Sequence, residues 1–282
     1  MTVNIRRQLG RFHVKTNFDP THHGVCKPER SRGSFPNHTQ SSTLGLFMQM
    51  LLAPTSALFH IGLWLMLPLL ACALRYAPWQ QLLTSSARQH LCFGSVLVLA
   101  LVWLLGVKVS PALAFHPVLM TVTTMLLGWS LALLAGTLAL LVMKLLQLAI
   151  VTAQMPLDSA WPLLNLYGLP VDFCLNVAVP ACWTWAVIAF VNRWSVKNPF
   201  TYFLGVGFFG ALAVCALIDA SAFLLFTLAG AAPQLAALHD YGWAFLLMSF
   251  PEGFLNGTLA TAFTVFWPDI VKTYRDDWFI PD

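Results

Sequence analysis

The chain has 282 residues, of which 58% are hydrophobic and only 9% are charged, and its mean hydropathy is +0.72. A soluble domain carries roughly 25% charged residues, so this composition excludes a soluble enzyme, a nucleic-acid-binding protein and a disordered regulator. The net charge of +4 is confined to the N-terminal part, because residues 1–47 hold seven basic and two acidic residues, whereas residues 48–282 hold eight basic and nine acidic residues. The larger part of the chain is therefore nearly neutral and is predicted to lie mostly in lipid.

The first 47 residues differ in kind from the rest. They are rich in Arg, His, Ser, Asn, Pro and Gly and contain no long apolar run. Such a segment buries too little apolar surface to offset its ordering entropy, which predicts a disordered basic tail. Met48 and Met50 stand where a membrane protein ordinarily begins, so an over-extended gene start is the alternative to a native tail. Residues 48–282 are predicted to form one polytopic membrane domain.

Seven apolar runs follow Met50, and about 20 residues are needed to cross the hydrocarbon core of a bilayer. We predict an all-α integral membrane protein with about seven spans, near residues 52–74, 90–107, 115–128, 129–153, 169–192, 201–230 and 243–266. The third and fourth runs form one apolar stretch that is too long for a single crossing, and Gly128 is its natural break point. The third run is short, so it is either a re-entrant half-helix or a span that begins earlier.

Loop charges predict the orientation through the excess of Lys and Arg in cytoplasmic loops. Seven crossings place the basic connections 75–89 and 193–199 and the residues after the last span on one side. They place the connections 154–168 and 231–242, each with a single Asp, on the other side, and Lys108 is the exception. The expected topology has the N-terminus outside and the C-terminus inside, in the cell (inner) membrane.

Glu252 follows Pro251 in the last apolar run, and a carboxylate at bilayer depth is a candidate for function. Either it faces a pathway or pairs with a buried group, or Pro251 breaks the helix and Glu252 caps the free N–H groups of the next turn. Gly253 and Gly257 form a G-x-x-x-G pattern, which favours close packing of another helix. All of these residues are structural or pathway candidates.

Further polar residues lie in or beside the apolar runs. His116, at the start of the third run, is either a metal ligand or proton carrier or an interfacial side chain. Asp219 interrupts the sixth run, where it either faces a lumen or pairs with a basic group. Asp172 is expected at the interface, and Lys144 is expected to extend its ammonium group towards the nearer helix end.

Three blocks of sequence resemble a known family. The distinctive block is Phe250-Pro251-Glu252-Gly253-Phe254-Leu255-Asn256-Gly257, followed by Trp267-Pro268 and Arg275-Asp276-Asp277. Weaker blocks are Arg75-Tyr76-Ala77-Pro78-Trp79, and Phe115-His116 with Thr121 to Trp129. Together they resemble the CbiM-like permeases of energy-coupling-factor ABC transporters, which are linked to cobalt and nickel uptake, over about residues 50–280.

The resemblance implies a membrane-embedded permease that captures substrate, while a separate coupling protein and ATPase subunits supply the energy. It implies a metal held by the free N-terminal amine, a His at position two and a His after the second span, the last of which His116 matches. No Met-His start occurs in this chain. The resemblance implies a transported divalent ion such as cobalt or nickel, rather than a permanently bound cofactor.

The leading interpretation is a transport subunit, and not an enzyme, for a transition-metal ion. No Walker A pattern occurs in the chain, which is consistent with energy supplied by partners. The expected partners are membrane lipid, the coupling protein, the ATPases and the metal ion, and no nucleic acid. The alternative is an integral-membrane enzyme or redox-complex subunit that uses His116 and Glu252.

Overall fold

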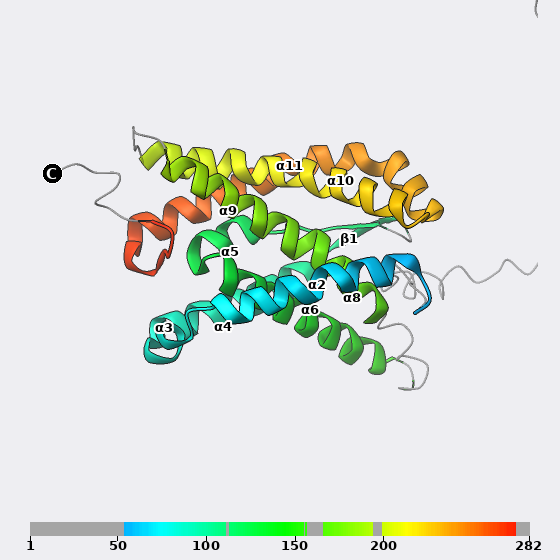
Figure 1. The fold of residues 1–282 in the computed structure, drawn as a ribbon, viewed down its shortest axis with the longest axis horizontal. Helices are drawn as coiled ribbons and strands as arrows, with labels where there is room; N and C mark the ends of the chain where they lie inside the picture. The colour runs from blue at the N-terminus through cyan, green and yellow to red at the C-terminus, as the bar shows by residue number, and fades with distance from the viewer. Residues whose placement is uncertain (1–53, 111–112, 155, 157–165, 194–198, 275–282) are drawn as a thin grey trace, which may run out of the picture. The chain divides into compact units, whose positions relative to one another are not determined.

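The computed structural model describes residues 54–110, 113–154, 156, 166–193 and 199–274. The chain divides into two units, Met1–His38 and Thr39–Asp282. The first unit and the whole expected basic tail lie outside the described residues. The following description concerns the second unit alone, whose helices run side by side in Figure 1.

Five helical segments are long and apolar enough to cross a membrane. Three are single helices: α2 (Ala57–Tyr76), α4 (Ser86–Leu104) and α6 (Trp129–Thr152). The fourth joins η3 (Leu166–Gly168), α8 (Leu169–Phe173), the π-helix η4 (Cys174–Ala178) and α9 (Val179–Asn192). The fifth joins the π-helix η5 (Thr201–Gly210) to α10 (Ala211–Leu228).

These five segments coincide with five of the seven predicted runs. At most 44% of any span's most apolar window is buried inside the structure. Large side chains such as Trp64, Phe93 and Phe223 are more than half exposed. A helix that is apolar on all sides requires apolar surroundings, so these segments are compatible with a transmembrane protein.

The third predicted span is not a full-length helix. Two short strands of a hairpin, β1 (Val107–Ser110) and β2 (Leu113–Phe115), pair antiparallel with Val107 opposite Phe115. The helix α5 (Met120–Leu127) then has only eight residues, or about 12 Å at 1.5 Å per residue. A full-length helical crossing over 115–128 is therefore not present, and the short helix agrees with the half-helix alternative. The hairpin is also a departure from an all-α fold.

The predicted break at Gly128 is confirmed. Gly128 has φ +82° and ψ 166°, and it separates α5 from α6. A side chain would be strained at this positive φ. The long apolar stretch therefore turns at this glycine instead of continuing as one helix.

The last helix, α11 (Ala232–Phe266), has 35 residues and contains Pro251 in its interior. The expectation that Pro251 breaks the helix is wrong. Proline removes one backbone hydrogen bond, but the packing of α11 along α10 and η5 keeps the helix continuous. Two short helices complete the described chain, α3 (Trp79–Thr84) and the 3-10 helix η6 (Pro268–Ile270).

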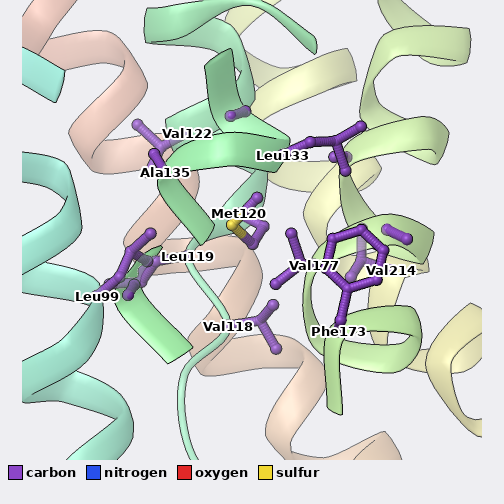
Figure 2. Packing of buried hydrophobic residues seen from close by; sticks show 14 of the residues in the cluster. Leu99, Val118, Leu119, Met120, Val122, Leu133, Ala135, Phe173, Val177 and Val214 are labelled. Atoms are coloured by element: carbon purple, nitrogen blue, oxygen red, sulfur yellow. The ribbon is translucent and has the colours of Figure 1, made fainter. Parts of the chain in front are cut away.

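The short helix α5 lies in the centre of the packing, and all eight of its residues are buried. It contacts α6, α9, α11 and η5. Figure 2 shows Met120 of α5 among side chains from several helices, with Leu133 and Ala135 of α6 and Val177 of η4 nearby. A Cβ atom at Gly136 of α6 would lie 2.6 Å from Val177 Cγ1, so this glycine lets α6 and η4 approach closely.

Candidate functional site at the ends of the short helix

A buried helix of eight residues has to find partners for the N–H groups at its start and the carbonyl groups at its end. Half of its backbone groups are terminal, because the first four N–H and last four C=O groups lack partners within the helix. Buried backbone groups without partners are costly, and in a bilayer no water replaces them. The residues that bind the two ends of α5 therefore define the candidate site.

Glu252 of α11 binds the chain at the start of α5. Its Oε2 accepts a hydrogen bond from the Val118 N–H, and its Oε1 accepts one from the Leu119 N–H, both at 2.8 Å. The Glu252 side chain is 3% exposed. A carboxylate beside a helix N-terminus also interacts favourably with the helix dipole.

Asn256 lies one turn further along α11 and completes this contact. Its Oδ1 accepts a hydrogen bond of 2.8 Å from the Val122 N–H. Its Nδ2 donates to Glu252 Oε1 at 2.7 Å and to the Glu252 carbonyl oxygen at 2.8 Å. Asn256 therefore binds α5 and also orients the carboxylate.

Leu119 has an unusual backbone conformation at the start of α5. It has φ +53° and ψ 11°, the left-handed region, which is uncommon for a residue other than glycine. The turn at Leu119 lets two consecutive N–H groups reach the same carboxylate. Trp103 of α4 donates a hydrogen bond from Nε1 to the Val118 carbonyl oxygen at 3.2 Å. Both the N–H and the carbonyl group of Val118 therefore have partners.

The other end of α5 is bound by the segment that follows α11. The Lys272 N–H donates to the Leu126 carbonyl oxygen at 3.0 Å. Thr273 donates to the Met125 carbonyl oxygen from its N–H at 3.3 Å and from Oγ1 at 2.8 Å. The Tyr202 hydroxyl of η5 in turn contacts Thr273 Oγ1. The last described residues of the chain therefore cap the C-terminal end of α5.

Gly253 and Gly257 lie where α11 packs against η5. A Cβ at Gly253 would lie 3.1 Å from the Phe208 carbonyl oxygen, and a Cβ at Gly257 would lie 3.2 Å from Phe208 Cβ. Larger side chains at these positions would push α11 away from η5. The two glycines thus set the position from which Glu252 and Asn256 reach α5.

His116 lies two residues before the first backbone group that Glu252 binds. Its ring is partly buried and lies 5.7 Å, between centroids, from the Trp103 ring. Its Nδ1 lies 3.4 Å from the Pro117 carbonyl oxygen. No group of three His, Cys, Asp or Glu side chains suited to a metal occurs among the described residues. The structure therefore places His116 close to the residues that bind the start of α5, outside any such group among the described residues.

Lys144 and Asp172 form an ion pair between α6 and α8. Lys144 Nζ lies 3.6 Å from Asp172 Oδ2, and the side chains are 2% and 21% exposed. The expectation that Lys144 extends to the helix end is wrong, because its ammonium group pairs with this carboxylate inside the structure. Asp219 of α10 is partly buried, and its Oδ1 is buried without a hydrogen-bond partner among the described residues.

The amino-acid sequence indicates Glu252 as a site residue but does not indicate its partners. Glu252 caps α5 and not its own helix, because the helix break assigned to Pro251 does not occur. The spacing of four residues between Glu252 and Asn256 was the available signal, since it places both side chains on one helical face. No sequence pattern indicated the hydrogen bond of Thr273 to Met125, because the two residues are 148 positions apart in the chain.

We predict that Glu252→Gln destabilises the protein. The amide keeps the shape of the carboxylate but places an NH₂ group against one of the Val118 and Leu119 N–H groups. A buried donor left without a partner costs about 1–3 kcal/mol. Thermal unfolding of the purified protein in detergent should show a clearly lowered midpoint and a reduced yield of monodisperse protein.

The matched control is Asp240→Asn, which makes the same chemical change at an exposed position of α11. It should unfold like the wild type. Equal unfolding midpoints for Glu252→Gln and the wild type would show that the carboxylate does not hold α5.

No family model, curated protein or solved structure matches this chain.

Proposed function

We propose that the chain is the membrane-embedded permease, or substrate-capture, subunit of an energy-coupling-factor type transporter, with a transition-metal ion as substrate. The observation that carries the proposal is the short buried helix α5, preceded by non-helical chain and clamped at both ends. Discontinuous helices of this kind are typical of the binding sites of transporters. Irregular backbone at membrane depth is tolerated where it is buried in protein or lines a cavity.

We propose a seven-pass topology in the inner membrane, in which the hairpin and α5 together make the third pass. Hydrogen bonds bring several segments to one end: Lys272 Nζ donates to Gln81 Oε1 at 3.0 Å, and Ser130 Oγ donates to the Tyr76 carbonyl oxygen at 3.4 Å. Arg75 lies at the end of α2, one residue before Tyr76. Basic residues favour the cytoplasmic side, so we assign this end to the cytoplasm and the hairpin to the outside.

His116 is the proposed donor to the metal ion. A neutral imidazole suits nickel, copper, zinc and cobalt, with affinity broadly following the Irving–Williams order. The Trp103 ring and the hydrogen bonds at Val118 restrict the chain on which His116 is carried. Further ligands would come from outside the described residues or from water.

The structure gives the enzyme alternative less support. Both carboxylate oxygens of Glu252 already accept hydrogen bonds from backbone N–H groups. A general acid or base has to reach the proton that it transfers, and Glu252 is committed to α5 instead. Transport therefore remains the function that we propose.

Metal binding is the direct test of the proposed substrate. Isothermal titration of the purified protein with nickel, cobalt, zinc and copper should show binding to the wild type. His116→Ala should abolish this binding while leaving the unfolding midpoint nearly unchanged, because its ring makes one long hydrogen bond.

His239→Ala is the matched control, since the His239 side chain is 89% exposed on α11. It should bind like the wild type. If the wild type binds none of the four ions, or if His116→Ala binds as well as the wild type, the metal assignment fails.

Cysteine labelling tests the topology. Single cysteines at Gln80 and Asp269, on a background without other cysteines, should react only with reagent supplied from the cytoplasmic side. Cysteines at Gln154 and Ala232 should react only from the outside. Labelling of Gln80 and Gln154 from the same side would contradict seven passes, whatever the substrate is.

A further inference from the structure

Asp219 lies inside a candidate membrane span and has one enclosed carboxyl oxygen. The residue comes nine positions before the end of α10 at Leu228, or about 13 Å from it at 1.5 Å per residue. Its Oδ1 is buried and has no hydrogen-bond partner among the described residues, although the side chain as a whole is only partly buried. A group from outside the chain cannot contact an oxygen that the protein encloses. A partner for Oδ1 would therefore have to come from the elements packed around α10.

These elements bring no cation to Asp219. α10 packs mainly on α11, α9, η5 and η4, and neither these four elements nor α10 itself contains a Lys or Arg. Their one histidine is His239 of α11, which is 89% exposed. A Cβ at Gly253 would lie 3.5 Å from Leu212 Cβ. Counting from this level along the two antiparallel helices places Asp219 about 10 Å short of His239, which is beyond hydrogen-bonding reach.

The other titratable groups of these elements do not supply a charge of opposite sign. Cys215, one turn before Asp219 on α10, interacts electrostatically with both Asp219 and Glu252, and a thiol has no positive form. The acidic groups Glu252 and Asp240 of α11 would only repel a second negative charge. The remaining thiols and phenols are ordinarily neutral, namely Cys174, Cys182, Tyr202 and Tyr241. An ionised Asp219 would therefore have no compensating charge on the described elements around it.

The environment of Glu252 is the opposite of that of Asp219. Its two oxygens accept hydrogen bonds from the Val118 and Leu119 N–H groups, and Asn256 Nδ2 donates to Oε1. An ionised carboxyl group spreads its charge over both oxygens, so an ionised Asp219 would place charge on Oδ1 with no donor beside it. A buried charge without a partner costs far more free energy than a buried neutral polar group, and such a group becomes neutral instead.

We propose that Asp219 is a proton-binding site, which holds one proton at neutral pH and releases it reversibly at alkaline pH. The ligand is a proton because its binding to either oxygen removes the charge from both, so Oδ1 itself need not be reached. The partly exposed remainder of the side chain provides the path by which the proton enters and leaves. The site goes beyond the proposed transport function and does not depend on it.

Infrared spectroscopy of the full-length protein measures this proton directly. A protonated carboxyl group has a C=O stretching band at higher wavenumber than the carboxylate and amide bands. In a maltoside detergent, which contributes no ester carbonyl band, the wild type at neutral pH should show such a band. Asp labelled with a heavy carbon isotope in its side-chain carboxyl should shift the band, which distinguishes Asp from Glu. The band should disappear at alkaline pH, with a gain of carboxylate absorption, and should return when the pH is lowered again.

Asp219→Asn should remove the band, and its unfolding midpoint should stay close to that of the wild type, because a neutral amide replaces a neutral acid of the same shape. Asp219→Glu keeps a carboxyl group and should retain a band that labelled Asp no longer shifts. Asp240→Asn is the matched control at an exposed position of α11, and it should keep the wild-type band.

A wild-type spectrum without an isotope-sensitive band at neutral pH would overturn the proposal. A band that survives Asp219→Asn, or one that still shifts with labelled Asp in Asp219→Glu, would also overturn it, because the proton would then lie on another residue. A band that persists at alkaline pH would overturn it too, since the proton would not be released.

Discussion

The structure depends on one constraint: a buried helix of eight residues cannot satisfy its own backbone. Both ends of α5 lie inside the packing, away from water, so other segments have to provide acceptors and donors. α11 provides the acceptors through Glu252 and Asn256, and the segment after α11 provides the donors through Lys272 and Thr273. The last part of the described chain thereby fixes a segment near the middle of the sequence.

This constraint explains the features of α11 that are unusual for a membrane helix. A buried Glu–Asn pair would be costly without partners, and here their polar atoms are used in hydrogen bonds with each other and with α5. Gly253 and Gly257 bring the helix close to Phe208 of η5. The continuous helix carries the acidic and amide side chains to one end of α5 and leads to the capping segment at the other end.

The sequence predicted the parts of the fold that depend on local pattern. Apolar runs of sufficient length predicted the five long segments, and the glycine at position 128 predicted the break between α5 and α6. The predicted helix break at Pro251 was wrong, because packing against neighbouring helices outweighs the loss of one hydrogen bond. The expected position of the Lys144 ammonium group was also wrong, because its partner Asp172 lies in another segment, 28 residues later in the chain. Local sequence pattern could not predict the partners of Glu252 either, because they lie more than 130 residues away in the chain.

The proposed transport function follows from the same constraint. The proposed metal donor, His116, lies in the chain that leads into this clamped helix. The clamp is therefore the feature on which both the fold and the proposed function depend.

Amide hydrogen exchange tests the clamp most directly. In the purified protein in detergent, the amides of Val118, Leu119 and Val122 should exchange as slowly as those of the buried part of α6. Asn256→Ala removes the acceptor of the Val122 N–H and the orienting contact on Glu252, and should accelerate exchange in the peptide 116–127 by about tenfold or more, as the loss of a buried hydrogen bond implies. Exchange in α6 should stay unchanged. Unaltered exchange in residues 116–127, or the same acceleration in α6, would contradict the account.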